Sequence, residues 1–216
     1  MKQQNISKES FPPLRELMND LMSEEELKKI LPSLKVEDIP GIDLYMDQVT
    51  TFMESRLGSS RRNETDKVLT KTMINNYAKN DLLPPPQKKK YSKEHLILMI
   101  FIYYFKGFLS MQDIRFLLQP LSQAFFGSED GPDIATVYET IFGAGLENLS
   151  CVSGDIETLT RRALDSFTDV PDEDRRQLQY FAMICFLSMD ITIKKRIVEK
   201  MIDAGASLRE DPAKNK

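Results

Sequence analysis

The sequence predicts an all-α protein with at most a small β-wing at residues 84–91. Apolar residues recur at three- and four-residue spacings along most of the 216-residue chain, which is typical of amphipathic helices. Ser, Thr or Asp precedes several of these stretches and Gly or Pro follows them, as expected at helix starts and stops. Strand signals, by contrast, are few.

Three helices are predicted before residue 58. Residues 14–22 carry the first apolar stripe, and Ser23 with Glu26 has the form of a capping box for the second helix. Asp43 is the candidate N-cap of the third helix, and Gly58 is its stop signal.

A short helix over residues 70–80 is predicted next, after a polar loop at residues 58–67. Thr70 can cap this helix. On a helical wheel, one arc holds Leu69, Met73, Ile74 and Tyr77. The opposite arc holds Lys71, Thr72, Asn75 and Lys79, with Asn76 at its margin. The pattern therefore predicts one face toward the core and one polar face toward solvent.

The stretch LLPPPQKKKYS separates that helix from the most apolar part of the chain. Residues 84–86 are prolines, which force the chain out of helix, and a short extended QKKKY follows. Ser92 starts the next helix, whose apolar run at 96–105 is shorter than the roughly 20 residues of a membrane span. The opening MKQQNISKES also lacks the apolar core of a secretory signal. We therefore expect a cytoplasmic protein without membrane association.

The remainder of the chain is predicted to be helical throughout. Ser110 caps a helix that Pro120 should end, and residues 127–132 should form a linker. An apolar stripe then indicates helix over residues 133–167. Two further helices should follow, the second being DITIKKRIVEKMIDAG, closed by Gly205.

Basic charge is concentrated in one segment of an acidic protein. Residues 58–95 hold nine Lys or Arg and four Asp or Glu, a local balance of +5. Because the whole chain carries −4, the remainder carries −9. This asymmetry indicates a local anion-binding surface, although a solvated face is the alternative.

Little in the sequence supports an enzyme. His95 is the single histidine, and no P-loop, GxGxxG, HExxH or nucleophile elbow is present. Cys151 and Cys185 stand far apart and outside any CxxC spacing, so we expect buried core thiols rather than metal or redox chemistry. We therefore predict no catalytic residue, no metal site and no cofactor.

The helix at 70–80 and the lysines after it have the composition of a nucleic-acid contact. In a major groove, Asn can pair with adenine, Thr can meet a thymine methyl group, and Lys can reach phosphate or guanine. The residues expected to bind DNA are Thr70, Lys71, Thr72, Asn75, Asn76, Tyr77, Lys79, Lys88, Lys89, Lys90 and Tyr91. A solvated surface helix without such a role is the alternative.

The same stretch resembles the DNA-binding domain of the MerR family. The matching residues are Thr70 and Tyr77 of the recognition helix, Leu82-Leu83-Pro84-Pro85 of the turn, Tyr91-Ser92 after a basic wing, and then Gly107, Ser110, Asp113 and Ile114. With IPGIDLYMDQVTTFM added, the block is also similar to an uncharacterised MerR-like family from Gram-positive bacteria. The resemblance covers residues 36–121, in which Asp81 stands where the turn glycine is usual.

The resemblance implies a winged helix-turn-helix transcriptional regulator that binds double-stranded promoter DNA as a homodimer, with RNA polymerase as a further candidate partner. The chain would then comprise an N-terminal helical extension (1–35), the MerR-like winged domain (36–121) and a helical C-terminal region for dimerisation or effector binding (122–216). A non-enzymatic protein-interaction module, using the winged domain or the acidic C-terminal half, is the alternative. A pocket for an unidentified small-molecule effector is compatible with both, among Tyr138, Phe142, Phe181 and Phe186, although a core role is favoured for these four.

Overall fold

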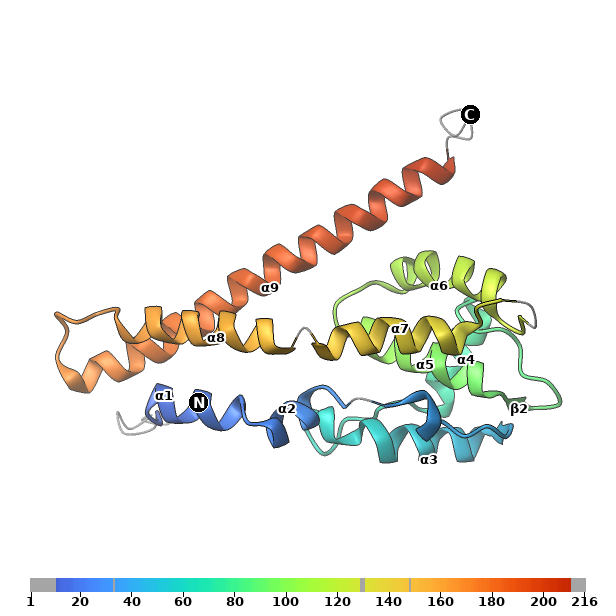
Figure 1. Cartoon of the computed structure of the whole chain (residues 1–216), viewed down its shortest axis with the longest axis horizontal. Helices are drawn as coiled ribbons and strands as arrows, with labels where there is room; N and C mark the ends of the chain where they lie inside the picture. Colours follow the sequence, from blue (N-terminus) through green and yellow to red (C-terminus); the bar gives the residue numbers. More distant parts are fainter. Residues whose placement is uncertain (1–10, 33, 129–130, 148, 211–216) are drawn as a thin grey trace, which may run out of the picture. The chain divides into compact units, whose positions relative to one another are not determined.

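The computed structural model describes residues 11–32, 34–128, 131–147 and 149–210, and helices account for most of them (Figure 1). The prediction of an all-α protein is therefore confirmed. The chain forms two compact units, one from Met1–Lys28 with Glu147–Arg196 and the other from Lys29–Leu146 with Ile197–Lys216. The division into functional regions at residues 35 and 121 stays a prediction.

The larger unit contains most of the elements. In chain order they are η2 (Val36–Asp38), β1 (Leu44–Tyr45), α3 (Met46–Leu57), η3 (Gly58–Ser60), α4 (Lys71–Lys79), β2 (Lys90–Tyr91), α5 (Lys93–Phe105), α6 (Met111–Phe125), α7 (Ile134–Glu147) and the last part of α9 (Asp172–Glu210). The two strands pair antiparallel, with Leu44 opposite Tyr91 and Tyr45 opposite Lys90.

Helix α5 is the centre of this unit. Eight consecutive residues, His95 to Ile102, are buried, so the helix is covered on every side. Val49 and Met53 of α3, Ile74 of α4 and Ile114 of α6 belong to the same core. A helix that is apolar on all sides is unfavourable at the surface. The neighbouring elements therefore pack around α5 and bury it.

Three predicted helix starts are confirmed by their caps. The Thr70 hydroxyl accepts from the backbone N–H of Met73 at 3.1 Å and begins α4. Ser92 precedes α5. At the start of α6 the capping is reciprocal, because the Asp113 N–H donates to Ser110 Oγ at 3.2 Å and the Ser110 N–H donates back to Asp113 Oδ2 at 3.1 Å.

Two predicted helix boundaries are wrong. Asp43 is not an N-cap, because Leu44 and Tyr45 pair with β2 and α3 begins only at Met46. Pro120 does not end α6, which continues to Phe125. A proline inside a helix costs about 3 kcal/mol. Burial of Leu118 and partial burial of Leu121 on either side of Pro120 offset this cost.

The last helix is also longer than predicted. Residues 172–210 form the single helix α9 where two helices were expected. Asp190 lies inside α9, where its carboxylate accepts from Lys194 Nζ at 2.7 Å, one turn on. Gly205 does not end the helix either. A Cβ atom there would lie 3.1 Å from the Phe116 ring, so glycine allows α9 to approach α6 closely.

The smaller unit has its own core. It contains α1 (Leu14–Leu21), α8 (Leu149–Leu164) and the first part of α9, with α2 (Glu24–Ile30) at its border. Leu14, Met18, Ala163, Ala182 and Met183 are buried together.

The predicted apolar stripe over residues 133–167 forms two helices, α7 and α8. Cys151 is exposed and Cys185 half-buried, so the prediction of buried thiols is wrong.

Two tyrosines hold the segment before η2 against the larger unit. The Tyr104 hydroxyl donates to the Pro32 carbonyl and the Tyr138 hydroxyl donates to the Leu34 carbonyl, both at 2.8 Å. Burial raises the pKa of Tyr104 to about 12, and burial also raises the pKa of Tyr138. Both hydroxyls therefore remain protonated donors at neutral pH.

Candidate nucleic-acid interface

Helix α4 is held with one face inward and one outward, as its sequence predicts. Ile74 is fully buried and Tyr77 is 5% exposed, and both pack in the core around α5. The outward residues are Lys71, Thr72, Asn75, Asn76 and Lys79, and all are exposed. The five polar side chains predicted to face DNA therefore lie on one accessible surface of a short helix.

Of the two lysines on this face of α4, Lys71 forms an ion pair. Its ammonium group forms an ion pair with the carboxylate of Asp47, in the first turn of α3. Lys79, at the other end of α4, has no ion-pair partner among the described residues. The basic character of the α4 surface is thus partly neutralised at its start and free at its end.

At the end of α4, Asp81 occupies the position that is usually glycine in a helix C-cap. Asp81 adopts a left-handed conformation with φ of 54°. The Leu82 N–H donates to the Tyr77 carbonyl at 2.9 Å and the Asp81 N–H donates to Ala78 at 3.3 Å, which is the Schellman arrangement. The Asp81 carboxylate then accepts from Arg115 at 3.0 Å. Asp81 therefore fills the turn position and also connects α4 to α6.

A tight turn at residues 87–90 carries the lysines. The Lys90 N–H donates to the Gln87 carbonyl at 2.9 Å, and the two residues form a β-bridge. Lys88 and Lys89 have φ of 49° and 63°, and two successive positive values are the mark of a type I′ turn. That turn favours Asn-Gly, because a side chain strains the left-handed backbone. Both lysines are exposed, and neither has an ion-pair partner in the part of the chain that the structure describes.

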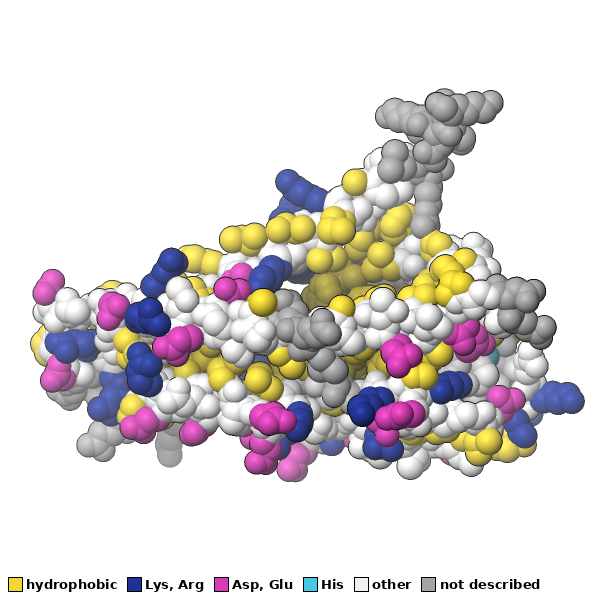
Figure 2. All heavy atoms as spheres, in the orientation of Figure 1, with side chains coloured by type: hydrophobic (Ala, Val, Ile, Leu, Met, Phe, Trp, Pro, Cys, Tyr) yellow, Lys and Arg dark blue, Asp and Glu magenta, His cyan; other side chains and the backbone are white. Residues whose placement is uncertain are grey.

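The two residues of β2, which follow the turn, face two ways. The Lys90 ammonium lies 5.1 Å from the centre of the Tyr45 ring, a cation–π contact across the paired strands. Tyr91 is 4% exposed and belongs to the core, and burial raises its pKa. Any part that Tyr77 and Tyr91 take in DNA binding is therefore through packing rather than through an accessible ring. Figure 2 shows Lys and Arg side chains projecting beside β2.

The long loop between α3 and α4 is fixed by polar contacts. Arg61 pairs with Glu54 at 2.6 Å and donates to the Gly58 and Asp66 carbonyls, each at 2.9 Å. Lys106 Nζ of α5 donates to the Val68 carbonyl at 2.5 Å, and burial lowers the pKa of Lys106. The loop therefore holds α4 in place despite its length.

His95 lies under the hairpin turn and is 2% exposed. Its Nδ1 accepts from the backbone N–H of Ser92 at 3.0 Å, so the proton of the neutral ring is on Nε2. Nε2 has no hydrogen-bond partner among the described atoms. Burial lowers the pKa of His95 from its ordinary 6.5, although the Pro84 and Pro85 carbonyls and the charge of Asp43 act in the opposite direction. His95 is thus a structural cap and not an accessible base.

The described residues contain no group of three or more His, Cys, Asp or Glu placed to hold a metal ion. Among the same residues, no helix is long and apolar enough to cross a membrane.

Fold and site together define a mostly helical protein that exposes the polar face of a short helix, α4, and a strained turn at residues 87–90 that carries lysines. Residues 34–141, half of the 216-residue chain, match the family described as Domain of unknown function (DUF1836). The chain belongs to this family. No curated protein and no solved structure matches it. The matched residues include all of α3, α4, both strands, α5 and α6.

Sequence reasoning missed three residues of the site. The sequence predicts Tyr45 to lie in a helix, and no pattern points to Asp47 or Arg115. Each meets its partner across a gap in the sequence, Lys90, Lys71 and Asp81 respectively. No local pattern could have found them, because these contacts depend on how the elements pack.

We predict that His95 makes stability fall as pH is lowered through 6.5. Because the folded-state pKa is below the unfolded value of 6.5, the unfolded chain binds more protons in this window. The free energy of unfolding should therefore be fully retained above pH 6.5. It should decline below that until the folded-state pKa is reached, by at most about 1.4 kcal/mol per pH unit. Urea titrations at a series of pH values measure this.

His95→Gln is the matched variant. His95 is the third residue of α5, where a Gln side chain can also accept from the N-cap N–H but cannot titrate. The difference in unfolding free energy between wild type and variant should depend on pH only below 6.5. A difference independent of pH would show that His95 does not titrate in this way.

Proposed function

We propose that the protein is a DNA-binding transcriptional regulator whose residues 36–121 form a MerR-like winged helix-turn-helix domain. In this proposal α3 and α4 are the helix pair, α4 enters the major groove, and the turn at 87–90 is the wing. The element order α3, α4, hairpin, α5, α6 supports it, because the MerR-like resemblance implies the same order.

The observation that carries the proposal is the turn at Lys88 and Lys89. Two residues in left-handed conformations are unfavourable, and strain of this kind gathers at functional sites. The strain is located at two exposed ammonium groups that have no ion-pair partners among the described residues. Phosphate oxygens are the natural partners of such groups. Thr72, Asn75 and Asn76 then provide the side chains that can read base edges.

Dimerisation is part of the proposal, and α9 in the C-terminal region offers an exposed apolar surface for it. Within Asp172–Arg196, the side chains of Phe181, Ile184 and Ile191 are at least half exposed. Ile184 and Ile191 are seven residues apart and Phe181 precedes Ile184 by three, so they share one helix face. Figure 2 shows hydrophobic side chains along this helix. In the proposed dimer, two copies of this face pack together.

Replacing Lys88, Lys89 and Lys90 with Gln should weaken DNA binding in a salt-dependent way. Each lost phosphate contact lowers the slope of log affinity against log salt by about 0.9, so the triple variant should lose up to about 2.7 units. Fluorescence anisotropy with a duplex over a salt series measures the slope. A matched control replaces the basic triplet Lys194, Lys195 and Arg196 of α9 with Gln and should leave the slope unchanged. An equal loss in both variants would contradict a local phosphate contact.

A second variant of the same turn separates binding from folding. Lys88→Asn with Lys89→Gly supplies the residues that a type I′ turn favours. The free energy of unfolding should therefore rise by about 1–2 kcal/mol while the salt slope falls by about 1.8. If this double variant instead had a lower free energy of unfolding than the wild type, its loss of DNA affinity would have a structural cause.

Asp47→Asn should strengthen DNA binding. The change frees the Lys71 ammonium group at the start of α4, so the salt slope should steepen by up to about 0.9. The same anisotropy series measures it. Asp20→Asn removes an equal charge from α1 and serves as the control. Unchanged affinity in Asp47→Asn would indicate that Lys71 does not approach phosphate.

Ile184→Glu with Ile191→Glu should convert a dimer into a monomer. Four glutamates would meet at the proposed interface, where desolvation and repulsion oppose association. Light scattering after size exclusion gives the mass. Met189→Glu with Ile193→Glu changes two equally exposed apolar side chains on another face of α9 and should leave the dimer intact. A wild-type protein with the mass of one chain would contradict the dimer.

The alternative is a protein-interaction module without DNA affinity, for which the exposed apolar residues of α9 are the favouring observation. Retention on heparin and on random duplex DNA at low salt distinguishes the two. A regulator should be retained by both, whereas an interaction module with this acidic composition should pass through.

A further inference from the structure

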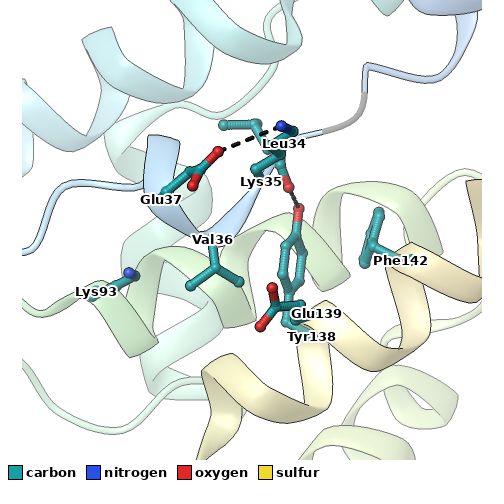
Figure 3. Close-up of a pocket in the computed structure, with 9 residues that line it drawn as sticks. Leu34, Lys35, Val36, Glu37, Lys93, Tyr138, Glu139 and Phe142 are labelled. Atoms are coloured by element: carbon teal, nitrogen blue, oxygen red, sulfur yellow. Dashed lines mark hydrogen bonds and ion pairs between the residues drawn. The ribbon is translucent and has the colours of Figure 1, made fainter.

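A cavity of about 620 Å³ lies within the larger unit, away from α4 and the turn at 87–90. Its lining comes from the segment around η2, from the start of α5 and from α7 (Figure 3). A volume of this size is typical of sites for small organic ligands. Of the four aromatics considered from the sequence, Tyr138 and Phe142 line it, whereas Phe181 and Phe186 belong to the other unit.

One wall of the cavity is flat and apolar. The rings of Tyr138 and Phe142 are stacked, with centroids 4.3 Å apart and planes at 27°. Tyr138 is only 1% exposed, so the half-buried Phe142 ring carries the accessible part of this wall. Val36 faces them from η2, as Figure 3 shows. The Tyr138 hydroxyl is already used, because it donates to the Leu34 carbonyl at 2.8 Å. The wall therefore favours a planar apolar group and has no free hydroxyl donor for it.

The polar groups of the cavity are charges on its rim. Lys35 and Glu37 neutralise one another at 3.4 Å. Lys93 and Glu139 have no ion-pair partner in the described part of the chain. Hydrogen bonds from the Thr136 hydroxyl and N–H lower the pKa of Asp133, and the charge of Lys93 has a smaller effect in the same direction. No ion pair joins Asp133 and Lys93. One ammonium and one carboxylate thus remain for a ligand.

We propose that this cavity binds a small zwitterion with a flat apolar body, of the chemical class of an aromatic amino acid. The ligand carboxylate pairs with Lys93, its ammonium pairs with Glu139, and its ring contacts the half-buried side chains of Phe142 and Val36. A ligand with a single charge leaves one rim group unpaired. The site is independent of the proposed DNA contacts, because none of its lining residues belongs to that surface.

L-Tryptophan is a suitable probe, because the protein contains no tryptophan and the probe's own fluorescence reports binding. The full chain should bind it at millimolar concentration. Tryptamine lacks the carboxylate and indole-3-propionate lacks the ammonium, so each should bind about two- to five-fold more weakly, as expected for loss of one exposed ion pair. Lys93→Gln should remove the advantage over tryptamine, and Glu139→Gln the advantage over indole-3-propionate.

Gly143→Leu fills the cavity and should abolish binding. A Cβ atom at Gly143 meets nothing within 4 Å, and leucine favours helix more than glycine does, so the variant should fold. Gly145→Leu makes the same change in α7 outside the cavity and should bind as wild type does. Three results would each overturn the proposal: no binding at millimolar concentration, undiminished binding in Gly143→Leu, or equal affinity for all three probes.

Discussion

Burial of α5 on all sides is the constraint on which the larger unit depends. A helix with eight consecutive buried residues must be enclosed, and each neighbour buries one apolar face against it. For α4 this fixes which face turns outward, because Ile74 and Tyr77 must point to α5. The polar arc of α4 is therefore exposed as a consequence of core packing. The hydrophobic effect, which is not directional, thus determines the orientation of a surface that has no apolar content of its own.

The start of α5 also fixes the position of the paired strands β1 and β2. Ser92 and His95 cap the helix, and Tyr91 immediately before them is buried in the same core as α5. The strand pair β1–β2 is only two residues long, and a ladder that short is marginal alone. Its stability must come from Tyr91 and Leu44, which the core holds. Lys93, two residues beyond β2, lines the cavity, so the turn and the cavity are joined by the same capped helix end.

Local chemistry was predictable from the sequence and long-range pairing was not. Thr70, Ser92 and Ser110 identified helix starts because capping involves residues only three apart. The two faces of α4 followed from its period for the same reason. Leu44 was misassigned because its strand partner is Tyr91, and no nearby residue signals that pairing. Pro120 and Gly205 were given their usual local meaning, which packing beside Leu118 and against Phe116 overrides. The ion pair of Lys71 depended on Asp47 in another helix, so its partial neutralisation could not be foreseen.

The basic residues near α4 and those of the turn at 87–90 differ in whether their charge is neutralised by an ion pair. Of the basic side chains around α4, Lys71, Arg61 and Arg115 are paired with Asp47, Glu54 and Asp81. Pairing leaves their charge largely cancelled at a distance, since opposite charges a few ångströms apart form a dipole whose field decays quickly. Lys88 and Lys89 are placed differently, at a tip where the backbone itself is unfavourable. Their position contributes nothing to folding that Asn-Gly would not provide at lower cost. In the proposed function, this strained, exposed and unneutralised pair of ammonium groups is the contact with phosphate.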